Sequence, residues 1–304
     1  MIVSVAIPAY KKEFLESCIQ SVLNQTFGDF ELIIVDDCSP HKLGGIVDKF
    51  SDSRIKFYRN EKNLGAEDPS MNWNICLKHA HGDFFCLLCD DDIYEPTFLE
   101  EMIQLAKSHP KCNVFRARAE IINEKGSIID YYPSSPLWES CEDYIWHVGR
   151  KLRKQTISEW MFRTSHIRKC GGYSNLPFAW GADYLSIYRF CIDGGIVSTT
   201  KLLVAYRRSS MNISTLAHKD SKMKLWANKQ FEEQVYILIA QNNLSPKLKN
   251  EVIRHKTIAD TYILSRISLW RLILQIFLRK KYGISKKAFL KGFEEKLYLM
   301  IKGK

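Results

Sequence analysis

The chain carries its apolar residues in two patterns, short continuous runs and runs with helical spacing. Val3–Pro8, Phe30–Val35 and Phe84–Cys89 are nearly unbroken apolar runs, as expected for strands that a sheet buries on both faces. Between them, Glu13–Gln25 and Met71–His81 repeat apolar residues every three or four positions. Strand and helix signals therefore alternate along the first half of the chain.

This alternation predicts an α/β fold with a mostly parallel central sheet and helices on both faces. Ligands of such sheets bind at the carboxyl ends of the strands. Two acidic clusters, Asp36-Asp37 and Asp90-Asp91-Asp92, follow predicted strands at that position. The other elements expected in this half are a helix around Gly45–Phe50, a strand at Arg54–Tyr58 and a helix at Thr97–Ser108.

The second half has a different order of elements. Val114–Asn123 and Ser127–Tyr131 flank Glu124-Lys125-Gly126, which predicts a hairpin. From about Leu216 the pattern is helical to the end. Between these regions we expect a helix at Glu139–Arg153, a strand at Gln155–Arg163, a loop from Gly171 to Asp183, a helix at Tyr184–Ile192 and a strand at Lys201–Arg207.

Three consecutive carboxylates, Asp90-Asp91-Asp92, come directly after the apolar run Phe84–Cys89. Burial of unpaired charge costs much free energy, so these side chains should emerge at the sheet edge and meet a cation. A divalent metal that carries phosphates suits them, because hard cations prefer carboxylate oxygens. The alternative is a solvated acidic turn ahead of the helix at Thr97.

Charge is unevenly distributed along the chain. Residues 1–253 contain 31 basic and 31 acidic residues, whereas residues 254–304 contain 13 basic and 3 acidic residues, which accounts for the whole net charge of +10. A neutral body argues against nucleic-acid binding, which needs a basic surface. A cationic tail favours local attachment to an anionic surface.

Composition limits the class of protein further. The 304 residues can form one large α/β domain with an appendage, or two modest domains. Nine cysteines without a regular framework point to a reducing compartment, and Cys86 and Cys89 should point to opposite faces of a strand as core residues. Met1–Pro8 lacks the basic lead of a secretory signal, and no stretch reaches the about 18 uncharged apolar residues of a membrane span. We expect a cytoplasmic protein, soluble or peripheral on a membrane.

Several segments, in their order and spacing, resemble family 2 glycosyltransferases: Val3–Tyr10, Ser21–Phe27, Phe30–Asp37, Asn63-Leu64-Gly65 and Asp90-Asp91-Asp92. The resemblance implies the GT-A fold, a nucleotide-sugar donor, Mn²⁺ or Mg²⁺ as cofactor, and inversion at the anomeric carbon. With it we expect residues 1–110 to form the nucleotide-sugar-binding half and residues 111–215 the acceptor-binding half of one domain. Residues 216–304 would then be a basic helical extension.

The resemblance also implies roles for the donor-site residues. Tyr10 would stack on the base and Asp37 would accept from its imide N–H, which favours uracil. Asp90 would face the ribose, and Asp91 or Asp92 would hold the metal, since Mg²⁺ needs only one or two protein carboxylates. The full set of expected nucleotide-sugar-binding residues is Pro8, Ala9, Tyr10, Asp37, Asn63, Asp90, Asp91 and Arg207.

In the expected donor site the chain departs from the family pattern at three places. Lys11 stands where the family usually has Asn, a difference to which we assign no role. The Arg common in the helix after Asn63-Leu64-Gly65 is absent from Met71-Asn72-Trp73-Asn74, which weakens the nucleotide assignment. Tyr206-Arg207 matches, but Ser209 or Ser210 replaces a His in the loop over the diphosphate. Arg207 or Arg208 can still clamp phosphate oxygens.

Inverting transfer needs a base that deprotonates the acceptor hydroxyl. The family places an acid after a Gly-Gly-aromatic segment at the start of a helix, and Asp183 occupies that place, with Ala182 instead of the usual Glu. The alternative role for Asp183 is helix capping. Trp180 and Tyr173 are the expected acceptor contacts, although a buried Trp is the alternative for Trp180.

We therefore expect a metal-dependent inverting glycosyltransferase that moves one sugar from a UDP-sugar to a glycan or lipid-linked acceptor. The Q-x-x-R-W signature of processive synthases is absent from the sequence. One alternative is a sugar-phosphate nucleotidyltransferase, but Pro8–Lys12 lacks the glycines of its phosphate loop. A second alternative is a non-catalytic nucleotide-sugar-binding protein.

The cationic tail contains two amphipathic segments. Basic amphipathic helices with Trp and Phe lie on anionic membranes, which would suit a lipid-linked acceptor at the inner face of the plasma membrane. Packing against the catalytic domain and a dimer interface are the alternatives. The apolar positions are Ile258, Tyr262, Ile263, Ile267, Trp270, Leu274 and Phe277 in the first segment and Phe289, Phe293, Leu297 and Met300 in the second.

Overall fold

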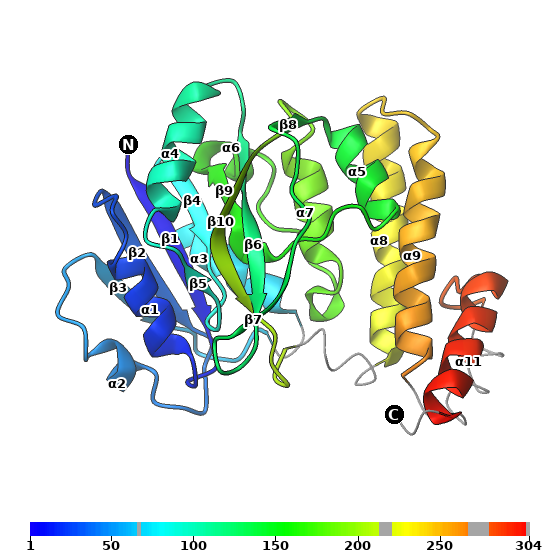
Figure 1. The fold of residues 1–304 in the computed structure, drawn as a ribbon, viewed down its shortest axis with the longest axis horizontal. Coiled ribbons are helices and arrows are strands. Elements are labelled where there is room, and N and C mark those ends of the chain that lie inside the picture. The colour runs from blue at the N-terminus through cyan, green and yellow to red at the C-terminus, as the bar shows by residue number, and fades with distance from the viewer. Residues whose placement is uncertain (66–67, 213–220, 267–279, 302–304) are drawn as a thin grey trace.

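The computed structural model describes residues 1–65, 68–212, 221–266 and 280–301, and its centre is one mixed sheet (Figure 1). The strands are β1 (Val3–Ala9), β2 (Phe30–Asp36), β3 (Ile55–Arg59), β4 (Phe84–Leu87), β5 (Ile93–Tyr94), β6 (Val114–Ile122), β7 (Ile128–Tyr131), β8 (Trp138–Glu139), β9 (Trp160–Arg163) and β10 (Ile196–Arg207). Their order is β3-β2-β1-β4-β9-β6-β10-β5, with β7 beside β6 and β8 beside β10.

Most strands of the sheet run in one direction. β1 pairs in parallel with β2 and β4, and β2 pairs in parallel with β3. β9 is antiparallel to both β4 and β6, and β10 is parallel to β6. The carboxyl ends of β1, β2, β4, β6 and β10 therefore lie along one edge, as the alternating sequence pattern predicted.

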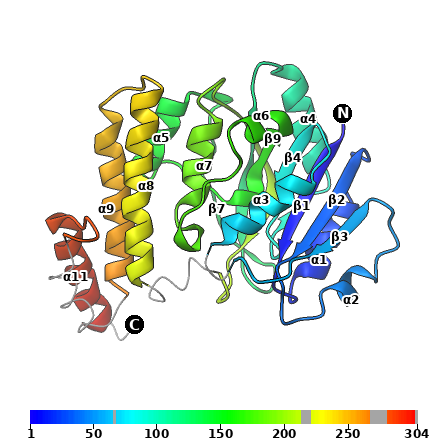
Figure 2. The same cartoon turned by 180° about the vertical axis from the view of Figure 1, so that it is seen from behind.

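Helices cover both faces of this sheet (Figures 1 and 2). One core joins α1 and α4 to the strands and the other joins α3, α5, α6 and α7. Because successive strand residues point to opposite faces, Val5 and Ile7 enter the first core while Ala6 enters the second. The α-helices of the first 190 residues are α1 (Leu15–Leu23), α2 (Gly44–Val47), α3 (Pro69–His79), α4 (Phe98–Ser108), α5 (Cys141–Gly149), α6 (Thr164–Lys169) and α7 (Ala182–Phe190).

Local sequence signals explain where α3 and α5 begin. The carboxylate of Asp68 accepts a 2.9 Å hydrogen bond from the backbone N–H of Ser70, and Pro69 is the first helical residue. The hydroxyl of Ser140 accepts from the backbone N–H of Asp143 at 3.1 Å. Each side chain satisfies a backbone donor that the first helical turn leaves unpaired.

The predicted hairpin and most predicted strands and helices are confirmed, but three elements differ. Gln155–Arg163 is not one strand, because Ile157–Glu159 forms a 3-10 turn and β9 starts at Trp160. Helix α6 was not predicted. β10 starts five residues before the predicted Lys201, because its register with β6 shifts between Ser198 and Val204 and hides the strand pattern.

The aspartate triplet lies in a turn after β4. The backbone N–H of Asp92 donates to the carbonyl of Cys89 at 3.0 Å, which closes the chain on itself. Asp90 and Asp92 therefore do not lie on one face of an extended segment. Cys86 lies in the first core and Cys89 packs against the second, so these two cysteines do point to opposite sides.

A helical extension made of α8 (Ser221–Gln241), α9 (Leu248–Leu264) and α11 (Lys286–Ile301) lies beyond α5 and α7, at the far side of the molecule from β3 (Figures 1 and 2). The side chain of Asn228 on α8 donates to Asp260 on α9 at 2.7 Å, and Asp260 also forms a buried 2.7 Å ion pair with Lys256 of its own helix. α11 packs closely on α9: a Cβ on Gly292 would lie 2.6 Å from Cβ of Leu264.

Two sequence predictions concern this extension. None of its described helices is long and apolar enough to cross a membrane. The predicted amphipathic positions Ile267, Trp270, Leu274 and Phe277 lie outside the described residues.

Candidate active site

Asp90 ties the end of β1 to the turn after β4. Its Oδ2 accepts from the backbone N–H groups of Tyr10 at 2.8 Å and Lys11 at 2.7 Å. The carbonyl of Tyr10 accepts in turn from the hydroxyl of Ser39 at 2.6 Å. The backbone at Tyr10 is thus fixed on both sides, while its ring remains 40% exposed.

Asp37 organises the loop that contains Asn63, Leu64 and Gly65. Its carboxylate accepts from the side chain of Asn60 at 2.8 Å, from Leu64 N–H at 3.0 Å and from Gly65 N–H at 2.6 Å. An ionised carboxylate offers about four acceptor positions, so one more donor can bind. Asp37 is only 4% exposed, however, and its role in base recognition stays a prediction.

Asn74 fills the region where the family's Arg is missing. Its Oδ1 accepts from the backbone N–H of Tyr173 at 2.8 Å, and its Nδ2 donates to the carbonyl of Tyr173 at 2.9 Å. Tyr173 is only 2% exposed and packs against Trp73 and Phe190. The expectation that Tyr173 touches the acceptor is not supported, because its ring belongs to the core.

Lys11 lies on the aspartate triplet. Its Nζ is 3.1 Å from Oδ1 of Asp90 and forms an ion pair with Oδ2 of Asp91. Burial alone would lower the pKa of Lys11, but the charges of Asp90 and Asp91 outweigh it and raise this pKa above its usual range. Giving no role to Lys11 was wrong. The sequence signal for this contact was a lysine two residues after β1, opposite an acidic triplet.

Asp92 is fully buried and both of its oxygens have protein donors. Oδ2 accepts from the hydroxyl of Ser158 at 2.5 Å, and Oδ1 accepts from the backbone N–H of Arg207 at 2.8 Å. Burial and the neighbouring charge of Asp91 raise the pKa of Asp92 to about 8. These contacts leave Asp92 poorly suited to bind a metal.

Asp91 fits a metal ion better. Within the described part of the chain, Lys11 is the hydrogen-bond partner of its Oδ2, and no hydrogen bond uses its Oδ1. The described part of the chain contains no group of three or more His, Cys, Asp or Glu side chains that could hold a metal. A divalent cation bound here would therefore take one or two protein oxygens and complete its shell with phosphates and water, which is usual for Mg²⁺.

Arg207 contacts the backbone of the aspartate triplet. Its side chain is buried, and its Nε donates to the carbonyl of Asp91 at 2.9 Å while Nη1 donates to the carbonyl of Asn123 at 3.1 Å. The guanidinium also lies 4.3 Å from the ring centre of Phe14. Because the side chain of Arg207 is buried and its Nε and Nη1 bind backbone carbonyls, the structure does not favour a phosphate clamp at this residue. Arg208 is the exposed neighbour.

Asp183 stands in the first turn of α7. Its Oδ2 accepts a 3.0 Å hydrogen bond from Nε2 of Gln155, and burial raises the pKa of the carboxyl above its usual range. The N-cap residue of α7 is Gly181, so Asp183 is not the cap. Phe178 (φ 58°) and Ala179 (φ 51°) just before it have left-handed backbone conformations, a type of strain that clusters at functional sites.

One short segment connects Asp183 to the triplet. Gln155 binds Asp183, and Ser158, three residues later, binds Asp92. Three residues span at most about 11 Å between Cα atoms. The structure therefore connects both acids to one short segment, whose residues the sequence assigned to a strand.

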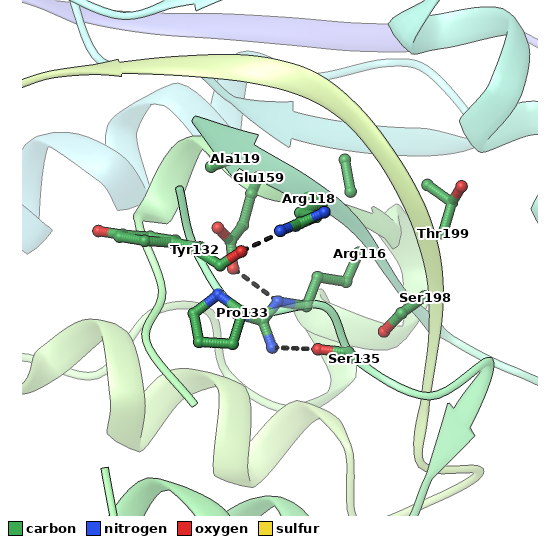
Figure 3. A pocket seen from close by; sticks show the side chains of 10 residues that line it. Arg116, Arg118, Ala119, Tyr132, Pro133, Ser135, Glu159, Ser198 and Thr199 are labelled. Atoms are coloured by element: carbon green, nitrogen blue, oxygen red, sulfur yellow. Dashed lines mark hydrogen bonds and ion pairs between the residues drawn. The ribbon is translucent and has the colours of Figure 1, made fainter. Parts of the chain in front are cut away.

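Glu159 follows this segment and forms a buried ion pair with Arg116. The Nε–Oε1 distance is 2.6 Å, and Arg116 also donates to the hydroxyl of Ser135 at 3.0 Å (Figure 3). Among the residues that the structure describes, the second oxygen of Glu159 has no hydrogen-bond partner. The pair lines a small pocket that sequence reasoning missed, because its two members are 43 residues apart.

Trp180 lies between the catalytic domain and the helical extension. Its ring is half-buried against the core of the extension, and Nζ of Lys224 lies 4.6 Å from the ring centre. One face of the ring is thus occupied by a cation–π contact. The role of Trp180 as a sugar platform stays a prediction.

Comparisons with known proteins agree with the fold described above. The sequence model of the family described as "Glycosyl transferase family 2" matches residues 4–168. The Escherichia coli "UDP-Glc:alpha-D-GlcNAc-diphosphoundecaprenol beta-1,3-glucosyltransferase WfgD" is 35% identical over 128 residues, which cover 42% of this chain and 49% of that protein. One uncharacterized glycosyltransferase of Haemophilus influenzae is 32% identical over 40% of each chain. In both relatives the match spans less than half of the relative's own length.

Solved structures show the same fold. The 1–349 fragment of S. aureus TarS, in complex with UDP-GlcNAc, superposes with a TM-score of 0.68 at 16% identity and covers 100% of this chain and 93% of its own. The mannosyltransferase PcManGT from Pyrobaculum calidifontis, in complex with GDP-Man and Mn²⁺, has a TM-score of 0.59 at 11% identity over 97% of this chain and 87% of its own. The predicted GT-A fold is confirmed. With more than half of its length matched by the family, the chain belongs to glycosyl transferase family 2.

Proposed function

We propose that this glycosyltransferase moves one sugar from a UDP-sugar to a glycan or lipid-linked saccharide, with inversion at the anomeric carbon. The observation that supports the proposal is that Gln155 hydrogen-bonds to Asp183 while Ser158, three residues later, hydrogen-bonds to Asp92. In this proposal residues 1–110 bind the donor and residues 111–215 bind the acceptor.

The donor base binds between Tyr10 and Asp37. The exposed ring of Tyr10 can stack on a pyrimidine, and the remaining acceptor position of Asp37 suits the imide N–H of uracil. Pro8, Ala9 and Asn63 complete this pocket. The names of WfgD and of the TarS complex include a UDP-sugar, whereas the PcManGT complex contains GDP-Man. Because these proteins differ in their nucleotide, the contacts to the base decide which nucleotide binds.

Mn²⁺ or Mg²⁺ would bind at Asp91, beside the ribose contact of Asp90. When bound, such a metal neutralises the charge that develops on the departing diphosphate. Contacts of two neighbouring residues hold this position in place. Arg207 holds the backbone of Asp91, and Ser158 holds the side chain of Asp92. The Mn²⁺ in the PcManGT complex supports a metal of this kind.

Asp183 acts as the base. Its carboxylate takes the proton of the acceptor hydroxyl while that oxygen bonds to the anomeric carbon and the bond to the diphosphate breaks. Attack from the face opposite the leaving group inverts the anomeric configuration. The raised pKa makes Asp183 a stronger base than an ordinary aspartate, and Gln155 fixes its orientation.

The helical extension binds an anionic membrane at its cytoplasmic face, where a lipid-linked acceptor would be presented. Phe289 and Phe293 pack against the core of the extension, whereas Leu297 (40%) and Ile301 (85%) are exposed on α11, a helix that carries four lysines and two glutamates. Glutamate at Leu297 and Ile301 should reduce flotation with anionic vesicles. The control Ile129→Glu, on the exposed strand β7, should float like the wild type. Unchanged flotation of the double variant would remove the membrane proposal.

A thermal-shift panel tests the donor. UDP-GlcNAc, UDP-glucose and GDP-mannose are each added with MnCl₂ or with EDTA. Only a ligand that binds the folded protein should raise its melting temperature. A ligand at a hundred times its Kd adds about 2.7 kcal/mol of stability. We expect shifts with UDP-sugars that Asp37→Asn reduces. No shift with any UDP-sugar in the presence of Mn²⁺ would contradict the proposed donor.

A further inference from the structure

Lys11 occupies the position where a cation is expected. Its ammonium group contacts Oδ1 of Asp90 at 3.1 Å and also Oδ2 of Asp91, and all three side chains are largely enclosed, with 22%, 5% and 3% exposure. Its backbone N–H also binds Asp90, at 2.7 Å. The root of the side chain is therefore fixed by the fold, while its four-carbon stem can rotate.

A divalent cation and this ammonium group cannot both use Asp91 at low cost. A metal bonded to one oxygen of Asp91 would lie within a few ångströms of a cation held by the other oxygen, and like charges at that distance repel strongly. The buried oxygens of Asp92 offer no alternative, because Ser158 and the backbone of Arg207 already occupy them.

We propose that Lys11 is a resident counter-ion that competes with the divalent cation for Asp91, so that the free enzyme binds the metal weakly. The diphosphate of the donor would supply new acceptors for the ammonium group as the metal takes its place. Metal and donor binding are then coupled. This coupling rests on the proposed donor site, whereas the competition itself does not.

The direct test measures Mn²⁺ affinity without any nucleotide, by the EPR signal of free Mn²⁺. Lys11→Met removes the ammonium group and keeps most of the chain length, and it should bind Mn²⁺ at least about tenfold more tightly than the wild type. Lys12→Met, at the exposed neighbouring lysine, removes the same formal charge and should change the affinity by less than about twofold. Adding Asp91→Asn to Lys11→Met should abolish the gain.

Equal Mn²⁺ affinity of Lys11→Met and the wild type would overturn the proposal, as would an equal gain in Lys12→Met. Circular dichroism checks that each variant folds, and Lys11→Gln replaces Lys11→Met if the latter does not. A second titration adds UDP, which should tighten Mn²⁺ binding by the wild type more than by Lys11→Met. If UDP does not bind at all, the proposed donor fails, and the nucleotide-free comparison still decides the competition.

Discussion

The hydroxyl of Ser158 donates a 2.5 Å hydrogen bond to Oδ2 of Asp92, across 66 residues of sequence. Ser158 also accepts from the backbone N–H of Cys89 at 3.1 Å, so one side chain holds the turn at two points. Through this contact the second half of the domain controls the shape of the acidic turn in the first half.

Removing this hydroxyl should destabilise the fold. Ser158→Ala leaves a buried oxygen of Asp92 without its donor, and we expect a loss of about 1–3 kcal/mol in the free energy of unfolding. Urea titration measures the loss. The matched control is Ser108→Ala, whose exposed hydroxyl only bonds back to Gln104, and its effect should stay below about 0.5 kcal/mol. Equal effects of the two variants would show that the Ser158 contact contributes nothing special.

Asp183→Asn should remove the base and leave the donor site intact. We expect kcat to fall by about 10²- to 10⁴-fold, while the Kd for the UDP-sugar stays within twofold of the wild type. Asp193→Asn, at an exposed aspartate just after α7, is the control and should keep full turnover. Full turnover in Asp183→Asn would favour a different base, and no turnover in the wild type would favour a non-catalytic binding protein.

Gln155 should control the pH dependence of turnover. Its hydrogen bond favours the ionised form of Asp183 and so lowers the pKa, against the larger effect of burial. A base must be deprotonated, so activity falls as the pH drops through this pKa. Gln155→Leu raises the pKa, and the acid limb of kcat/KM should move to higher pH. A limb that moves to lower pH, or a uniform loss at every pH, would contradict this role.

The pair of Arg116 and Glu159 should behave as a coupled unit. Removing one partner leaves a buried charge uncompensated, so Glu159→Gln and Arg116→Met should each cost about 3–5 kcal/mol of unfolding free energy. The double variant should lose less than the sum of the two single losses. Additive losses in urea titrations would show that the two charges do not interact.

His255 should make the protein less stable in mild acid. Its ring packs on Tyr184 and Phe231, and burial lowers the pKa from 6.5 to about 4. The unfolded chain takes up the proton more readily, so stability is full above pH 6.5 and is lost as the pH falls toward 4, by up to about 3 kcal/mol. His255→Phe removes the titration. If both proteins lose equal stability between pH 7 and pH 5, other groups cause the loss.

The strands of the first half were predictable because each is a continuous apolar run beside an amphipathic helix. Val3–Ala9 and Phe30–Asp36 match their predictions to within one residue, and their order predicted the α/β class, whereas the GT-A fold was implied by the family resemblance. Ile157–Glu159 was not predictable in the same way, since its residues are buried by side-chain contacts and not by strand pairing.

The sequence by itself placed acids at the ends of strands, because parallel strands bring their carboxyl ends to one edge whatever the loops do. Asp37 and the triplet Asp90-Asp91-Asp92 follow predicted strands, whereas the choice of Asp183 was implied by the family resemblance. Only the tertiary structure decided what each one contacts. The partners Lys11, Ser158 and Gln155 lie 28 to 80 residues away along the chain, and no local pattern encodes a hydrogen bond between such distant segments. Packing of the two halves determines those contacts, and with them which carboxylate remains for a metal.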